Sequence, residues 1–311
     1  MDLRESIPPA LTIALVMLAC SGLPSLGLET PTVTAPASPT SSAPPLTVAQ
    51  VLNAEYTVTT FSGEAHVDKL TDGAYNHGTD PAAADFVSVH IVAIDPGQQV
   101  VFGDLNEDGA QDAAVLLAEN YGGTGVFVSV AAVLNENGQP KHAASYTIDD
   151  RPAISALSVE DGEIFLAAVV HGPNDPGCCP AMPVTRVFRL VGAQLTLVGA
   201  TSQTPDGTER AITINTPLES ADVTGSLQLQ GSVTIAPFEN TLGYSIHNRD
   251  GAELASGPIS VLAADPGGPG TFDVILDLDG VPPGPVLLII ADFSAADGAV
   301  LALDSVQLNV R

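Results

Sequence analysis

Residues 226–248, SLQLQGSVTIAPFENTLGYSIHN, decide the fold class because apolar and polar side chains alternate along them. A period of two is typical of a strand that buries one face and leaves the other in water. From residue 211 onward the same alternation recurs in about seven short strands separated by turn residues, the spacing of a β-sandwich. The expected strands are Ile212–Asn215, Ser226–Leu229, Ser232–Ile235, Leu242–Asn248, Thr271–Leu276, Val286–Phe293 and Ser305–Val310.

Residues 46–199 carry a second set of short strands and are expected to form a separate β-rich domain. Turn signals such as Asn137–Gly138 and Asp161–Gly162 separate the apolar runs, which favours sequential hairpins in an antiparallel sheet. A short helix is predicted near Thr47, its cap, and residues 200–210 are predicted to be a linker. The sequence therefore predicts a mainly β protein: an antiparallel sheet domain with a little helix at 46–199, then a sandwich at 211–311. The expected strands of the first domain are Ala113–Ala118, Val126–Leu134, Ala153–Val159, Ile164–Val170, Val184–Leu190 and Leu195–Val198.

The composition of the chain agrees with this fold class and restricts its partners. Among 311 residues there are 29 glycines and 25 prolines, and only 14% of residues are charged. This favours short strands joined by turns over long amphipathic helices. The formal net charge of -27 would repel nucleic acid and anionic lipid headgroups, so nucleic-acid partners are excluded. The same acidity serves solubility or salty surroundings, or else the binding of cationic ligands.

The N-terminal segment is typical of an export signal. Residues 11–19, LTIALVMLA, form an apolar run too short to span a bilayer, and Cys20 follows a small residue at its end. This resembles the lipobox of bacterial lipoproteins, which implies a signal peptide at 1–19 and a lipid anchor on Cys20 at the outer face of the cell membrane. An ordinary signal peptide cut near Gly22, or an uncleaved anchor, are the alternatives. Residues 20–45, rich in Pro, Ser and Thr, are expected to form an extended linker.

The last third of the chain resembles the immunoglobulin-like domain found at the end of bacterial spore-germination proteins and of many bacterial lipoproteins. The resemblance implies an immunoglobulin-like β-sandwich at 211–311 that acts outside the cytoplasm as a non-catalytic adhesion or spacing module. It does not imply a role in germination. The motifs that carry it, in chain order, are Ile212–Ile214, Thr216–Pro217, Val223, Gly225, Gly231–Val233, FENTLGY at 238–244, Asp250–Gly251, Gly270, Phe272, Pro283–Pro285 and FSAADG at 293–298.

One acidic loop, GDLNEDGAQD at 103–112, has the pattern of a calcium site. Asp104, Asn106 and Asp108 alternate, Gly109 permits a tight turn, and Asp112 follows, so several oxygens can converge on one hard cation. The loop resembles the calcium loops of integrin-type β-propeller repeats, which implies that Asp104, Asn106, Asp108, Asp112 and the carbonyl of Ala110 are the ligands of a structural calcium ion. The alternative is an Asx-rich hairpin turn without metal.

A cysteine pair in the segment NDPGCCP, residues 174–180, is the second unusual motif. Once Cys20 is lipidated, Cys178 and Cys179 are the remaining thiols in an oxidising compartment. They are expected to form a disulfide with each other, while pairing with another chain or metal binding with His171 are the alternatives. Residues 100–185 as a whole resemble an uncharacterised domain of exported bacterial proteins.

No motif pairs a nucleophile with a base, so we expect no enzymatic activity. The six histidines are scattered, Ser129, Ser155 and Ser158 lie in strand-like runs, and Glu55, Glu64 and Asp68 are not joined by any motif. The expected function is that of a non-catalytic, tethered envelope module that binds an unknown protein or ligand. A solute- or glycan-binding lipoprotein is the main alternative, although a content of 5% aromatic residues without Trp weakens the glycan version. An envelope enzyme is the third.

Overall fold

The computed structural model of the chain describes residues 43–59, 65–83, 85–94 and 97–311. The predicted signal peptide at 1–19, Cys20 and nearly all of the predicted linker at 20–45 lie outside the described residues, as does Glu64. Within the described part of the chain, no helix is both long and apolar enough to cross a membrane. All of the described residues belong to one compact unit.

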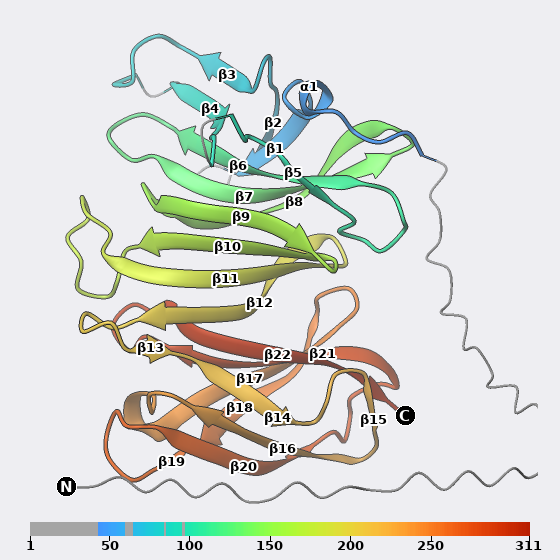
Figure 1. Ribbon diagram of the computed structural model, residues 1–311, viewed down its shortest axis with the longest axis vertical. Helices are drawn as coiled ribbons and strands as arrows, with labels where there is room; N and C mark the ends of the chain where they lie inside the picture. The colour runs from blue at the N-terminus through green and yellow to red at the C-terminus, as the bar shows by residue number, and fades with distance from the viewer. Residues whose placement is uncertain (1–42, 60–64, 84, 95–96) are drawn as a thin grey trace, which may run out of the picture. The chain divides into compact units, whose positions relative to one another are not determined.

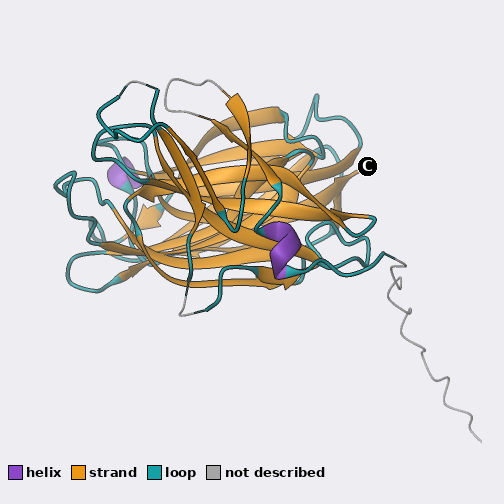
Figure 2. Ribbon diagram, turned by 90° about the horizontal axis from the view of Figure 1, so that it is seen from above, coloured by secondary structure: helices purple, strands orange, loops and turns teal. Residues whose placement is uncertain are grey.

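Nearly all regular secondary structure in the described part is β-strand, and the strands pair mainly antiparallel, which confirms the predicted fold class (Figure 2). The predicted helix is α1 (Val48–Val51), shown in purple. Its cap is Thr47, whose hydroxyl accepts from the Gln50 amide at 3.3 Å while the Gln50 side chain accepts from the Thr47 amide at 2.9 Å. These reciprocal bonds satisfy two amides that would otherwise lack partners at the start of the helix. A 3-10 turn, η1 (Phe238–Asn240), lies in the last domain.

A six-stranded sheet forms the first layer among the described residues, with β6 at its centre (Figure 1). Strand β6 is buried on both faces, because its apolar residues enter two different hydrophobic clusters. Ala114, Leu116 and Ala118 pack into one cluster, and the alternate residues Ala113, Val115 and Leu117 pack into another, which includes residues of β1. The six strands of this sheet are β3 (Ala74–His77), β4 (Val87–Ile91), β5 (Val101–Gly103), β6 (Asp112–Asn120), β7 (Phe127–Glu136) and β8 (Gln139–Asp150). A separate two-stranded sheet is formed by β1 (Glu55–Thr59) and β2 (Ala65–Lys69).

A ten-stranded sheet joins strands from both predicted domains. Strands β9 to β12 are followed in space by β22, β21, β17 and β18 (Figure 1). The junction between β12 and β22 is narrow: Ala200 pairs with Leu303, and the Ser305 hydroxyl donates to the Val198 carbonyl at 2.7 Å. The strands are β9 (Ala153–Glu160), β10 (Glu163–Val170), β11 (Met182–Val191), β12 (Gln194–Gln203), β13 (Glu209–Arg210), β15 (Ala221–Val223), β17 (Thr241–Asn248), β18 (Glu253–Ser260), β21 (Gly284–Phe293) and β22 (Val300–Val310).

A four-stranded sheet completes the sandwich of the last domain, with one hydrophobic cluster shared between the two layers. Gly231 lies where the backbone must pass close to the ring of Phe272, since a Cβ at this position would lie 2.2 Å from that ring. A side chain larger than glycine would not fit at this close approach, and both residues belong to the motifs quoted above. The strands are β14 (Ile212–Thr216), β16 (Ser226–Val233), β19 (Leu262–Ala263) and β20 (Gly270–Asp277).

The predicted linker at 200–210 is more ordered than its composition indicates. Its first residues, up to Gln203, extend β12, and its last two residues form β13, which pairs back onto β12. A turn closed by the Gly207 amide, which donates to the Thr204 carbonyl at 2.9 Å, connects them. The stretch is therefore a hairpin within the sheet and not a free connection.

Candidate functional site

The predicted calcium loop connects β5 to β6, and its side chains are bonded to the backbone of the loop itself. One oxygen of Asp104 accepts from the Gly109 amide at 2.8 Å, and one of Asp108 accepts from the Ala110 amide at 2.7 Å. The amide oxygen of Asn106 accepts from the Asp108 backbone at 3.2 Å. These are the bonds of an Asx-rich turn, and they hold three oxygen-bearing side chains in one loop.

Asp112, the last predicted ligand, is fully buried and both of its oxygens are occupied. The Leu105 amide donates to one oxygen at 2.9 Å and the Asn135 amide donates to the other at 2.8 Å. Burial raises the pKa of this carboxyl against the effect of the two amides. In the part of the chain that the structure describes, no group of three or more His, Cys, Asp or Glu side chains is arranged to hold a metal ion. The donor types suit calcium, and calcium binding stays a prediction.

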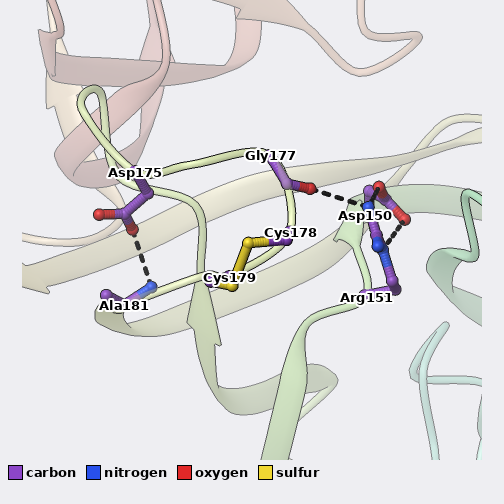
Figure 3. The surroundings of a disulfide bond; sticks show 7 residues. All are labelled: Asp150, Arg151, Asp175, Gly177, Cys178, Cys179 and Ala181. Atoms are coloured by element: carbon purple, nitrogen blue, oxygen red, sulfur yellow. Dashed lines mark hydrogen bonds and ion pairs between the residues drawn. A yellow bond between two sulfur atoms is a disulfide. The ribbon is translucent and has the colours of Figure 1, made fainter.

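Cys178 and Cys179 are joined by a disulfide in the loop between β10 and β11 (Figure 3). Asp175 organises the loop, because one of its oxygens accepts from the Gly172 and Ala181 amides, each at 2.8 Å. Arg151 connects the loop to the turn between β8 and β9: its guanidinium donates to the Gly177 carbonyl at 2.8 Å and pairs with Asp150. The pair holds the pKa of Asp150 below its usual range.

His171, the alternative metal ligand near the cysteines, is bonded to a carboxylate. Its Nδ1 atom lies 2.9 Å from an oxygen of Asp149. The structure therefore places a histidine–carboxylate pair at the base of the cysteine loop, while the sulfurs bond to each other.

A hollow of about 600 Å³ in the last domain is lined by two exposed aromatic rings. Phe238 is 67% exposed and Phe293 is 50% exposed. Gly243 on β17 leaves room for the second ring, since a Cβ there would lie 3.2 Å from it. Arg210 and the buried Asp292 also line the hollow and form an ion pair of 2.6 Å. Both rings come from segments singled out by sequence, FENTLGY and FSAADG.

A cavity of about 620 Å³ in the first domain holds a buried carboxyl group that sequence reasoning missed. Glu119 lines it, is 5% exposed, and accepts a hydrogen bond from the Tyr121 hydroxyl. Burial raises the pKa of Glu119, against the hydrogen bonds of Tyr121 and Ser129. The signal was present in the alternation of β6, where Glu119 continues the apolar face of Val115 and Leu117.

A second buried acid lies close to Glu119 in the folded chain. Asp68 on β2 is 5% exposed and lies 2.7 Å from Nδ1 of His66, in a geometry that does not meet the angular requirement of a hydrogen bond. The charges of both residues act on Glu119, and the ring of His66 meets that of Tyr121 edge-on at 6.0 Å. The fold thus brings together Asp68 and Glu119, which no sequence motif connects.

The architecture places the chain among antiparallel β proteins that end in an immunoglobulin-like sandwich, and a family comparison identifies that sandwich. Residues 211–299 match the family described as the immunoglobulin-like domain of bacterial spore germination, which confirms the resemblance inferred from the motifs. No curated protein matches the chain. One matching crystal structure is the extracellular domain of a one-component system from B. thetaiotaomicron, with 9% identity and a TM-score of 0.20. That match covers 83% of this chain, which spans 44% of the other chain's length.

Proposed function

We propose that this protein is an exported, membrane-tethered interaction module of the bacterial cell envelope, without catalytic activity of its own. The observation that carries the proposal is the hollow beside Phe238 and Phe293. Two aromatic rings, 67% and 50% exposed, lie together beside this concave surface. Exposed apolar patches mark interaction sites, and aromatic anchors dominate the energetics of protein interfaces. The immunoglobulin-like domain would therefore bind an envelope partner at the end that carries these rings.

The charge of the chain sets the chemistry of the partner. A net charge of -27 disfavours association with a second copy of the same chain and favours a basic surface. Within the hollow, the Arg210–Asp292 pair is internally neutral. A basic envelope protein with an apolar protrusion meets both conditions.

The remaining features of the chain fit a tethered module. In this proposal, lipidation of Cys20 fixes the chain to the outer face of the membrane, and residues 20–45 hold the folded part away from it. The loop of Asp104, Asn106, Asp108, Ala110 and Asp112 binds calcium in a structural role, stabilising the first domain. Support for the tether comes from the sequence pattern alone, and support for calcium comes from the oxygen donors held in one loop.

Site-specific photo-cross-linking in the bacterium that makes the protein tests the interaction. A photoreactive phenylalanine analogue replaces Phe238 and, as a matched control, Ile275, which is 72% exposed on β20. We expect one covalent adduct from position 238, containing a basic protein, and none from position 275. The adduct should disappear when Phe293 is changed to Ser. Equal adducts from both positions, or an adduct that survives Phe293→Ser, would contradict the proposal.

A further inference from the structure

The cavity at Glu119 is built from polar groups of several strands. Glu119 of β6 and Ser129 of β7 lie on the sheet face that carries the hairpin of β1 and β2, and Ser129 is paired with Thr147 of β8 in the ladder. Hydroxyl, imidazole and amide groups line the same cavity, and a volume of about 620 Å³ is in the range of small-molecule sites. The polar lining residues are Thr57, Thr59, Glu119, Ser129, His142, Ser145, Tyr146, Thr147 and Gln194.

His142 in the cavity wall is held in its neutral form. The Thr57 amide donates to its Nδ1 atom at 3.2 Å, so this nitrogen carries no proton, and Nε2 lies 2.8 Å from the Ser145 hydroxyl. Burial also lowers the pKa of His142. The imidazole therefore supplies no positive charge to the cavity.

Glu119 differs from the other buried carboxylates by what surrounds it. Asp112 receives two backbone amides, and Asp292 receives the guanidinium of Arg210. Glu119 receives hydroxyl groups, from Tyr121 and Ser129. Among the described residues, no Lys or Arg forms an ion pair with Glu119 or with its neighbour Asp68. The imidazole of His66 lies 2.7 Å from Asp68 and also acts on Glu119, so one histidine faces two buried acids. Burial of two carboxylates with so little positive charge is unfavourable, and Glu119 borders a cavity.

We propose that this cavity binds a small primary amine, whose ammonium group pairs with the Glu119 carboxylate. An ammonium ion has three donors and no acceptor, and the carboxylate with the hydroxyls of Ser129 and Thr147 offers oxygens on adjoining strands. The acidity of the whole chain adds a long-range attraction for cations. This site lies in the first domain and is independent of the proposed protein interface.

Calorimetric titration of the full chain with two matched probes tests the inference. The probes are 1,4-diaminobutane and 1,4-butanediol, which have similar length and differ in charge, at about 0.15 M salt to screen diffuse attraction. We expect the diamine to bind and the diol not to bind. Glu119→Gln should weaken diamine binding about tenfold or more, as expected for loss of a charged hydrogen-bond partner. The same change at the exposed Glu160 should leave binding unchanged.

Amide NMR shifts of the unaltered protein provide a readout that does not depend on the folding of a variant. The diamine should shift the amides of Thr57, Ser145 and Thr147 at saturating concentration, while Thr271 of the last domain stays unchanged. Three outcomes would overturn the inference: no diamine binding, equal binding of the diol, or shifts spread over the acidic surface. Retention of full affinity by a folded Glu119→Gln protein would overturn it as well.

Discussion

Strand β6 carries a buried acidic residue near each end, and the two carboxyl groups have different hydrogen-bond partners. At the start, Asp112 is 0% exposed and has a backbone amide on each oxygen. Near the other end, Glu119 is 5% exposed, is bonded to hydroxyls and borders a cavity. Amide donors belong to a fixed backbone, whereas hydroxyls rotate and can exchange partners. The contacts of Asp112 therefore belong to the fold, whereas those of Glu119 leave it able to take the ligand role proposed above.

The largest effect is expected from Asp112→Ala. This change leaves two buried amides without an acceptor, at a cost of about 1–3 kcal/mol each, so the free energy of unfolding should fall by about 4 kcal/mol. Urea denaturation measures it. Asp265→Ala, at an exposed position, is the control and should change stability by less than about 0.5 kcal/mol. If Asp112→Ala lowers the free energy of unfolding as little as the control does, Asp112 does not have the structural role assigned to it.

A third buried acid sharpens the comparison, because Asp292 is paired with a guanidinium. Arg210→Leu should lower the free energy of unfolding by about 2 kcal/mol, a value reduced for the partial exposure of Arg210. The double change Arg210→Leu and Asp292→Leu should recover part of the loss, since no charge then remains buried. If the double variant is no more stable than the Arg210→Leu variant, the unpaired charge of Asp292 is not the cause of the loss of stability.

Glu119→Gln should raise the free energy of unfolding at neutral pH, by about 1 kcal/mol, because a neutral amide replaces a buried carboxylate. The raised pKa of Glu119 predicts the pH dependence. Below the ordinary pKa, Glu119 is protonated in both the folded and the unfolded chain and does not reduce stability. As pH rises through the raised pKa of the folded protein, the buried carboxyl ionises and the protein loses stability. The gain of the Gln variant should therefore be small at about pH 4.5 and grow toward pH 8. A gain that does not change with pH would contradict the assignment.

The smallest effect is expected from calcium, which tests whether the loop before Asp112 is more than a turn. Millimolar calcium should raise the unfolding temperature of the full chain by a few degrees relative to a chelator. Asp108→Ala should abolish the difference, because it removes one of the proposed ligands. Equal unfolding temperatures with calcium and with chelator would contradict calcium binding and show that the loop is an Asx-rich turn without metal.

Local sequence patterns could predict the strands but not how they combine. Alternation predicted most strands of the sandwich, and a capping residue predicted α1, because both signals lie within a few residues. The pairing of Ala200 with Leu303 joins positions far apart in the chain, and no local pattern encodes it. The short strands β3 and β5 were missed because they contain too few residues to show a period, and the longer strands β8 and β18 were missed as well.

The candidate sites were predictable to different degrees for the same reason. The cysteine loop and the Asp104 loop each lie within a dozen residues, so their composition alone singles them out. The Glu119 cavity depends on strands that meet only after folding, and on the hairpin of β1 and β2 covering one face of β6. Alternation assigns Glu119 to that face, but a single sequence does not indicate that the face is buried.

The bond between Cys178 and Cys179 has a practical consequence for its detection. Because it joins neighbours in the sequence, it closes no long segment and connects no distant parts of the chain. In a tryptic digest both cysteines fall in one peptide between Lys141 and Arg186, since Pro152 follows Arg151. The oxidised and reduced proteins therefore give the same set of fragments, distinguished by two hydrogen atoms in the mass of that peptide. A gel that reveals crosslinks by altered mobility would not register this bond.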